Sequence, residues 1–365
     1  MPGPDTHLRV AIDARYWRGS FQTGVERYIL LLLEALGTVH EQVRTAVVVR
    51  DSEQAAFPVD AFPHVNVLTV SSRHAHALTR ALRGFAPDLV HYPFDLPRRF
   101  DHPAVYTLHD PGRYLYPELM VKRIREKDND LLRDQIRHPQ LRAIITVSQS
   151  SRADIVNVFG EPPQPLAVVP NFIDSRFAAQ LHHARATARP SEQPFLLAVG
   201  VYIPTKNIPR LVRAFRLARH AAPDIVPPQL RLVGRLGWER GFPVNGAPDI
   251  AVLGHLSNER LAQHFATCTA FVWPSFYEGF GLPVQEALAA GAPVLVADTP
   301  VNHEIAGDLV TYTDPYDDDQ MAKAIITRCQ QPPPTAQTVT EHLAHYSAAT
   351  AGAALLDTYR RALDR

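Results

Sequence analysis

The sequence is poor in cysteine and shows no excess of charge of either sign. Among 365 residues only Cys268 and Cys329 are cysteines, and their spacing suggests neither a zinc site nor a disulfide framework. Lysine plus arginine equals aspartate plus glutamate at 37 each, so no overall field favours nucleic acid as a partner. Because so few cysteines suit a reducing compartment, we expect a cytoplasmic protein.

The sequence also lacks long apolar runs and several familiar signatures. Residues 1–6 have neither the basic nor the apolar part of a signal sequence, and the apolar run 29–33 stops at Glu34, so we expect no membrane span. No P-loop, metalloprotease helix or Ser-His-Asp grouping is present, and Gly279 and Gly281 lack the third glycine of a dinucleotide fingerprint. The composition of the chain, with 46% apolar and 20% charged residues, is that of an ordinary globular protein.

Short runs rich in Val, Ile and Leu recur along the chain, and many precede a stretch of helical period. This alternation predicts parallel sheets with helices on both faces, in two doubly wound α/β domains. The expected strands are residues 10–13, 46–49, 89–92, 105–108, 144–147 and 167–169, then 195–199, 230–233, 250–253, 271–273, 294–297 and 309–312.

The two series of strands define the expected domains. The first domain covers residues 1–172 and the second 194–345, and the polar stretch 173–193 between them is expected to be a linker. Residues 346–365 contain a terminal helix. Ligands of open α/β sheets bind at the carboxyl ends of strands, so we expect the two edges to face one another across a cleft.

A glycine-rich turn follows the expected strand 271–273 and leads into a helix whose first turn suits Pro283. A helix start carries roughly half a positive charge and binds anions, so a diphosphate is the expected guest. Glu278 before the turn and Glu286 in the first helical turn can accept hydrogen bonds from hydroxyls, one holding a sugar and the other a ribose. An ordinary strand-to-helix corner is the alternative. The outward N–H groups would be those of Gly279, Phe280, Gly281 and Leu282.

Lys206 is a second candidate, at the end of the stretch that follows strand 195–199. It comes immediately before a helix that Asn207 can cap, at a strand's carboxyl end, where an ammonium can reach a phosphate. Surface lysines are common, so a solvated loop residue is the alternative.

Residues 274–286 resemble the Glu-x7-Glu motif of family 4 of the retaining glycosyltransferases, and residues 287–298 read like that family too. The resemblance runs from residue 10 to about residue 326. It implies the two-domain GT-B fold, with an amino-terminal acceptor domain, a carboxy-terminal nucleotide-sugar domain and a terminal helix that returns to the first domain.

The resemblance implies that Lys206 neutralises the leaving nucleoside diphosphate. Many family members have an arginine directly after the glycine that corresponds to Gly200, and others have one directly before the lysine. Here those positions hold Val201 and Thr205. We therefore expect Arg235, which follows strand 230–233, to supply the second cation.

In the first domain the family commonly has His-Asp at a strand end, with the imidazole near the donor sugar, and this sequence has His109 there. A structural hydrogen bond is the alternative role. Residues 22–28 resemble the family's glycine loop. Where some members have a second glycine this sequence has Glu26, so only Gly24 is expected to bind the donor.

Neither a metal nor a cofactor is expected. The patterns Asp128-Asn-Asp130 and Asp317-Asp-Asp319 could suggest a metal clamp, but a charged helical run and a helix start explain them better. Residues 122–137 hold six basic residues with four interspersed acids, which favours a solvated face. Peripheral contact with anionic lipid at an inner membrane face is a secondary hypothesis.

By this resemblance the chain is identified as a member of the metal-independent, retaining hexosyltransferases, which move a sugar from a nucleoside diphosphate to a hydroxyl of a glycan or lipid-linked acceptor. Its motifs are similar to those of bacterial surface-polysaccharide enzymes, many of which use GDP-mannose. Rhamnose, fucose and N-acetylglucosamine are alternative sugars. A nucleotide-sugar epimerase or phosphorylase is an alternative within the fold, and a catalytically idle nucleotide-sugar-binding or scaffold protein is one from another class.

Overall fold

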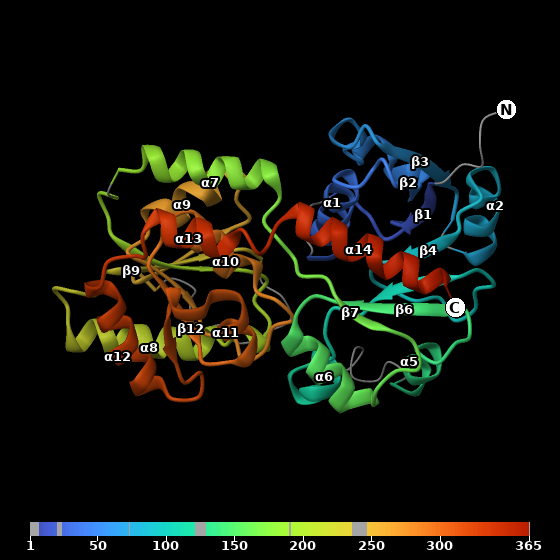
Figure 1. Cartoon of the computed structure of the whole chain (residues 1–365). Coiled ribbons are helices and arrows are strands. Elements are labelled where there is room, and N and C mark those ends of the chain that lie inside the picture. Colours follow the sequence, from blue (N-terminus) through green and yellow to red (C-terminus); the bar gives the residue numbers. More distant parts are fainter. Residues whose placement is uncertain are drawn as a thin grey trace. The chain divides into compact units, whose positions relative to one another are not determined.

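A computed structural model describes residues 7–19, 24–72, 74–120, 129–189, 191–235 and 247–364. The chain divides into two compact units, which are described separately (Figure 1). Unit 1 comprises Met1–Tyr114, Glu126–Asp174 and Tyr346–Arg365, and unit 2 comprises Leu115–Arg125 and Ser175–His345.

Unit 1 is built on a parallel sheet with the strand order β3-β2-β1-β4-β5-β6-β7 in the described residues. The chain runs outward from β1 to β3 and then crosses back to β4 on the other side of β1. The order therefore reverses between β1 and β4, where Ile12 and His91 are register partners. The strands are β1 (Leu8–Asp13), β2 (Val43–Arg50), β3 (Val65–Val70), β4 (Leu89–Tyr92), β5 (Ala104–Thr107), β6 (Leu141–Thr146) and β7 (Leu166–Val168).

Helices cover both faces of the unit 1 sheet. Helices α1 and α14 pack against each other, and in Figure 1 the red α14 runs beside α1. Helices α2, α5 and α6 contribute Leu78, Leu132 and Ile155 to the apolar core on the other face. The helices are α1 (Gly24–Gly37), α2 (Ala75–Phe85), α3 (Gly112–Leu115), α5 (Asn129–Gln135), α6 (Gln149–Phe159) and α14 (Ala348–Leu363), with 3-10 turns η1 (Asp51–Ala56) and η2 (Val59–Ala61).

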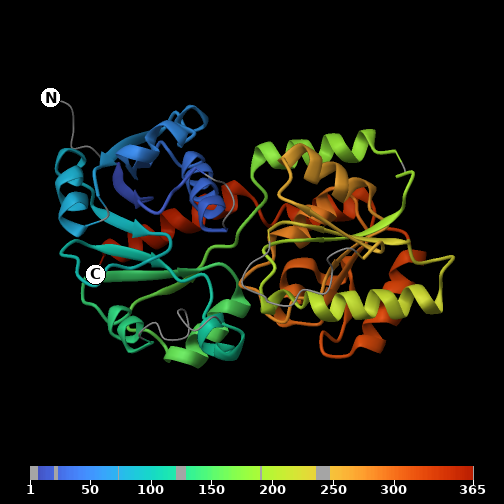
Figure 2. The same cartoon turned by 180° about the vertical axis from the view of Figure 1, so that it is seen from behind.

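Unit 2 has a second parallel sheet, with the order β10-β9-β8-β11-β12-β13 in the described residues, so its order reverses between β8 and β11. Figure 2 shows this sheet edge-on between a layer containing α7 and a layer containing α8. The strands are β8 (Phe195–Val199), β9 (Gln229–Val233), β10 (Ile250–Gly254), β11 (Ala270–Trp273), β12 (Val294–Ala297) and β13 (Thr311–Thr313).

The helices of unit 2 follow the same alternation with its strands. Helices α8 and α12 pack together over one face, and α7 packs against α9 on the other. They are α7 (Ser175–Thr187), α8 (Ile208–Ala221), α9 (Asn258–Thr267), α10 (Leu282–Ala289), α11 (Pro300–Ala306), α12 (Asp318–Gln330) and α13 (Ala336–Leu343), with 3-10 turns η3 (Pro117–Leu119), η4 (Pro204–Lys206) and η5 (Gly307–Leu309).

The predicted fold class, two doubly wound parallel sheets, is confirmed. Strand β3 was not predicted, because Asn66 and Thr69 interrupt the apolar residues of Val65–Val70, which lies at the edge of its sheet. The helix predicted at 348–363 is α14.

The expected linker over residues 173–193 is wrong for most of its length. Residues 175–187 form helix α7, whose Phe177, Leu181 and Ala184 are buried against unit 2. These three residues have the i, i+4, i+7 spacing of one helix face. The numerous His and Arg residues around them belong to the other faces of the helix and concealed this pattern.

No helix in the described ranges is both long and apolar enough to cross a lipid bilayer.

Candidate functional site

Lys206 and Glu278 meet at the carboxyl ends of β8 and β11, the two neighbouring strands where the order of the unit 2 sheet reverses. Lys206 Nζ lies 2.5 Å from Glu278 Oε1, and the two side chains are 16% and 12% exposed. The same ammonium lies 4.9 Å from the centroid of the Trp273 ring. From the sequence, Lys206 is predicted to contact a phosphate and Glu278 to accept hydrogen bonds from a sugar. The structure brings the two together as a half-desolvated ion pair over an aromatic ring.

Hydrogen bonds join the turn that carries Lys206 to the loop that carries Glu278. The amide of Asn207 donates to Pro274 O at 3.1 Å and to Pro315 O at 2.8 Å, and Phe276 N donates to Thr205 O at 2.9 Å. Asn207 precedes α8 with φ 58°, but its side chain does not cap the helix. The expected capping role of Asn207 is therefore wrong: its amide fixes the spacing between ammonium and carboxylate instead.

Gly281 provides the start of helix α10. It has φ 103°, and a Cβ there would lie 2.9 Å from Ile305 Cδ1, so both the backbone and the space favour glycine. Pro283 lies in the first turn of the helix. Phe280 is buried in the core, whereas Gly279 and Leu282 are half-buried. The helix start thus presents backbone, and not the Phe280 ring, at this end of the sheet.

Glu286 does not lie in the first helical turn, contrary to expectation. Because Gly281 is the N-cap, Leu282 is the first residue of α10 and Glu286 the fifth. Its side chain is only 1% exposed. Glu286 is therefore a buried carboxylate within α10 and not a group at the helix tip.

Three further polar side chains lie in or near helix α10, and the sequence did not identify them as candidate site residues. In the part of the chain that the structure describes, they have buried atoms without a hydrogen-bond partner: Ser275 Oγ, Asn302 Oδ1 and both amide atoms of Gln285. Asn302 Oδ1 lies 3.9 Å from a Cβ built at Gly281. Since an unpaired buried polar group costs about 1–3 kcal/mol, these atoms suit a polar guest or bound water. Only their proximity to the glycine turn could have suggested them.

Arg235 follows β9 and its side chain is exposed. Its carbonyl accepts a hydrogen bond from Tyr202 N at 3.0 Å. Gly234, with φ 127°, lets the backbone come so close to Gly200 that an added Cβ would lie 1.8 Å from Gly200 O. The ends of β8 and β9 are therefore tied together, with the guanidinium accessible beside them. Residues 236–246, including Gly237 and Trp238, lie outside the described residues.

His109 follows β5 in unit 1. Its Nε2 lies 2.8 Å from Pro93 O, and its ring packs edge-on against Tyr28 at a centroid distance of 4.5 Å. Burial lowers the pKa of His109, so the imidazole is neutral near neutral pH. A carbonyl oxygen only accepts, so Nε2 carries the hydrogen and Nδ1 of the neutral ring is an acceptor. His109 can therefore accept a hydrogen bond from a hydroxyl.

A buried polar network lies beneath His109, and sequence analysis missed it. His91 Nδ1 lies 2.7 Å from Tyr359 OH of α14, and its Nε2 lies 2.7 Å from Thr107 Oγ1. Thr107 Oγ1 is in turn 2.9 Å from Tyr28 OH. Burial lowers the pKa of His91 to about 3, with a smaller contribution from His109. A histidine inside an otherwise apolar strand was the available signal.

Gly24 is the first residue of α1, is exposed, and an added Cβ would meet no atom of the described residues within 4 Å. The rest of the glycine loop, residues 20–23, lies outside the described residues. Glu26, which replaces a glycine of the family, is 3% exposed and accepts a hydrogen bond from Arg18 N at 3.0 Å. This departure from the family pattern is therefore a structural contact.

The predicted helix start explains the acidic run 317–319. Asp317 is the N-cap of α12 and accepts from the backbone of Asp319 and Gln320, and Asp318 pairs with Arg210 and Arg213. Asp128 lies outside the described residues. Over the described ranges, no three His, Cys, Asp or Glu side chains are grouped so as to hold a metal ion.

Known proteins resemble the chain over both units. The glycosyl transferases group 1 match residues 181–342, and glycosyltransferase family 4 matches residues 22–177. O-antigen chain mannosyltransferase B of Escherichia coli is 31% identical over 275 residues, which cover 70% of this chain and 69% of that protein. O-antigen chain mannosyltransferase RfbU of Salmonella typhimurium is 23% identical over 66% of this chain and 64% of its own length.

Among solved structures, sucrose-phosphate synthase from Thermosynechococcus elongatus superposes with a TM-score of 0.66 at 18% identity, covering 97% of this chain and 94% of that one. Two doubly wound units of this kind define the GT-B fold of glycosyltransferases. Because the two family models match the two halves of the chain and the Escherichia coli relative is 31% identical, the protein belongs to family 4 of the glycosyltransferases and is itself a glycosyltransferase.

Proposed function

We propose that this glycosyltransferase transfers mannose from GDP-mannose to a hydroxyl of a glycan or lipid-linked acceptor in surface-polysaccharide synthesis, with retention of configuration and without a metal. The observation that carries the proposal is the Lys206–Glu278 pair beside the start of α10. The O-antigen mannosyltransferases among its relatives favour mannose as the sugar.

Unit 2 would bind the donor. The diphosphate would lie at the backbone of Gly279, Phe280, Gly281 and Leu282 and draw the Lys206 ammonium away from Glu278. Cationic groups aimed at an oxygen whose charge grows in the transition state lower the barrier, and this is the role of Lys206 and of Arg235. Glu278, released from Lys206, would accept hydrogen bonds from the sugar, and Glu286 would accept from the ribose.

Unit 1 would bind the acceptor. Its Gly24 would bind the donor, and its His109 would lie near the donor sugar. Retention without an enzymic nucleophile requires the acceptor to attack the face from which the diphosphate leaves. A phosphate oxygen then takes the acceptor proton. In this scheme the protein supplies orientation and charge stabilisation and forms no covalent bond to the sugar.

A panel of nucleotide sugars tests the proposal. A ligand at a hundred times its dissociation constant adds about 2.7 kcal/mol of stability, so the true donor should raise the melting temperature more than any other. Nuclear magnetic resonance of the product would then report its anomeric configuration. A larger shift with a rhamnose, fucose or N-acetylglucosamine donor would replace mannose, and an inverted product would exclude the retaining mechanism.

The competing proposal is an idle nucleotide-sugar-binding protein, which the missing arginine beside Lys206 favours. Release of nucleoside diphosphate only when acceptor is added would exclude it. With a lipid-linked acceptor, the enzyme would work in the cytoplasm at the inner face of a membrane. Co-sedimentation with vesicles containing anionic lipid would test the contact proposed for residues 122–137.

A further inference from the structure

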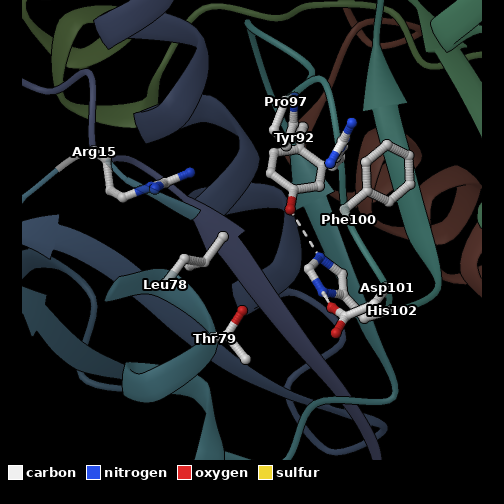
Figure 3. Close-up of a pocket in the computed structure, with 9 residues that line it drawn as sticks. Arg15, Leu78, Thr79, Tyr92, Pro97, Phe100, Asp101 and His102 are labelled. Carbon is white, nitrogen blue, oxygen red and sulfur yellow. Dashed lines mark hydrogen bonds and ion pairs between the residues drawn. The ribbon is translucent and has the colours of Figure 1, made fainter. Parts of the chain in front are cut away.

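A pocket of about 280 Å³ opens in unit 1 at the carboxyl ends of β1 and β4, where the strand order reverses (Figure 3). Open α/β sheets bind ligands at this kind of position. The pocket is formed by Arg15 after β1, by Leu78 and Thr79 of α2, by Tyr92 at the end of β4, and by Pro97, Arg99, Phe100, Asp101 and His102 of the following loop. None of these residues belongs to the sites described above.

One wall of the pocket is aromatic with a polar edge. The rings of Tyr92 and Phe100 have centroids 5.9 Å apart. Tyr92 OH lies 2.7 Å from His102 Nε2, which the dashed line in Figure 3 marks, and His102 Nδ1 lies 3.4 Å from Asp101 Oδ1. Burial lowers the pKa of His102, so this edge carries a neutral imidazole. An apolar wall with a few polar groups at its edge is the usual lining of a site for a small molecule.

The buried charge beside this wall is already neutralised. Arg15 is 4% exposed, and its Nε and one terminal nitrogen lie 2.7 and 2.8 Å from the two carboxylate oxygens of Asp13. Its other terminal nitrogen donates to His74 O at 3.1 Å. A phosphate or carboxylate entering the pocket would have to compete with Asp13 for this guanidinium. The exposed side chains of Arg99 and Asp101 add one charge of each sign to the lining, so the lining as a whole carries balanced charge and does not select an anion.

An exposed aromatic pair follows the same two strands, β1 and β4. Tyr16 and Phe94 pack edge to face with centroids 5.9 Å apart, and Phe94 is 40% exposed. Tyr16 follows Arg15 in the chain, and Phe94 comes two residues after Tyr92. Between them in sequence, Pro93 offers the carbonyl that holds His109. Arg15, the exposed rings and His109 thus follow the carboxyl ends of the neighbouring strands β1, β4 and β5.

We propose that this pocket binds one non-reacting pyranose ring of a saccharide acceptor, with Phe94 and Tyr16 flanking the next ring towards His109. Sugar rings present apolar C–H faces to aromatic side chains and hydroxyls to polar edges, which is the pattern of this lining. The volume is near the lower limit of small-molecule sites, so it holds a single ring and not a chain. The inference rests on the proposed function and specifies the acceptor class: a glycan with at least one sugar beyond the reacting one.

The test uses the full chain with methyl α-D-mannoside and an α-linked mannotriose as probes, in calorimetry and ligand-observed nuclear magnetic resonance. Thr79→Trp fills the pocket, and Phe94→Ala removes the exposed ring. Each should weaken mannotriose binding about tenfold, the effect of losing one well-packed aromatic contact or more. Arg80→Trp is the matched control, because Arg80 is exposed on the same helix and does not line the pocket.

The outcomes separate this inference from the proposed function. If GDP-mannose stabilises the chain but mannotriose does not bind, or binds Thr79→Trp and Phe94→Ala as tightly as the wild type, the pocket assignment is wrong and the proposed function stands. If mannotriose binding depends on both residues but no nucleotide sugar binds, the pocket stands and the proposed function fails. Displacement of mannotriose by inorganic phosphate at equal concentration would show an anion site instead and overturn the inference.

Discussion

In unit 2 the strand ends carry an ion pair beside a helix start, whereas in unit 1 they carry aromatic side chains around a compensated ion pair. Lys206, Glu278 and the start of α10 mark the reversal point of one sheet, and the compensated Arg15–Asp13 pair with Tyr92 and Phe94 marks that of the other. Both sheets place their polar groups at the same topological position. In open α/β sheets the topology sets where a ligand can bind, and the residues at the strand ends set which ligand chemistry is accepted.

The largest effect is expected from a substitution of Lys206 in the ion pair of unit 2. Lys206→Ala should lower turnover about 100-fold or more and change donor affinity less, because the charge that Lys206 meets is greatest as the phosphate leaves. Arg210→Ala, which breaks a surface pair with Asp318, is the control and should retain activity. Steady-state kinetics with the donor found by the panel would measure both.

Removing Lys206 also leaves Glu278 partly buried without its cation, which destabilises the loop. The double variant Lys206→Met with Glu278→Gln relieves this cost. If the double variant regains wild-type turnover, Lys206 has no part in the reaction and the charged strand ends of unit 2 are structural.

The two glutamates of unit 2 should differ in what they bind. Glu286→Gln loses the charge that accepts from both ribose hydroxyls, so it should weaken the bare nucleoside diphosphate by about tenfold, as for one lost charge-assisted hydrogen bond. Glu278→Gln removes the competitor for Lys206, so affinity for the bare diphosphate should hold while transfer falls. Calorimetry with diphosphate alone and turnover assays would separate the two. Equal weakening by both substitutions would contradict this placement of the donor.

The buried His91 of unit 1 predicts that the free energy of unfolding depends on pH. Burial lowers the pKa of His91 to about 3 in the folded chain, whereas in the unfolded chain the imidazole has its ordinary pKa of 6.5. Its stabilising contribution is full above pH 6.5 and is lost progressively as the pH falls towards 3. Between about pH 7 and pH 5 this amounts to about 2 kcal/mol.

Urea unfolding of the full chain at the two pH values would measure this loss. His91→Gln should reduce it by about that amount, because glutamine does not titrate, and His182→Gln on the exposed face of α7 is the control. An unchanged pH dependence in His91→Gln would show that the pKa of His91 is not lowered in the folded state.

The smallest effect is expected from metal removal. Transfer should continue in the presence of a chelator, because Asp317 caps α12, Asp318 is paired with arginines, and side chains with a helix start can supply the positive charge at the donor. Rate measurements with and without the chelator test this. Loss of activity that magnesium or manganese restores would contradict it and direct attention to Asp128.

The sequence by itself determined the alternation of strands and helices, because continuous apolar runs such as Phe195–Val199 and Val294–Ala297 can be buried on both faces only in a parallel sheet. It also placed Lys206, Glu278, Arg235 and His109 at strand ends, since strand order along the chain fixes those positions. It did not reveal helix α7, whose apolar face of three residues was masked by basic neighbours.

Only the tertiary structure decided which side chains meet. Lys206 and Glu278 are 72 residues apart and His91 and Tyr359 are 268 apart, and no local pattern encodes either pair. The same holds for the cap of α10, which places Glu286 beyond the first turn, and for the aromatic-walled pocket of unit 1. Local propensity sets an element's type, but burial and pairing depend on which elements the sheet brings together, because desolvation and hydrogen bonding act between neighbours in space.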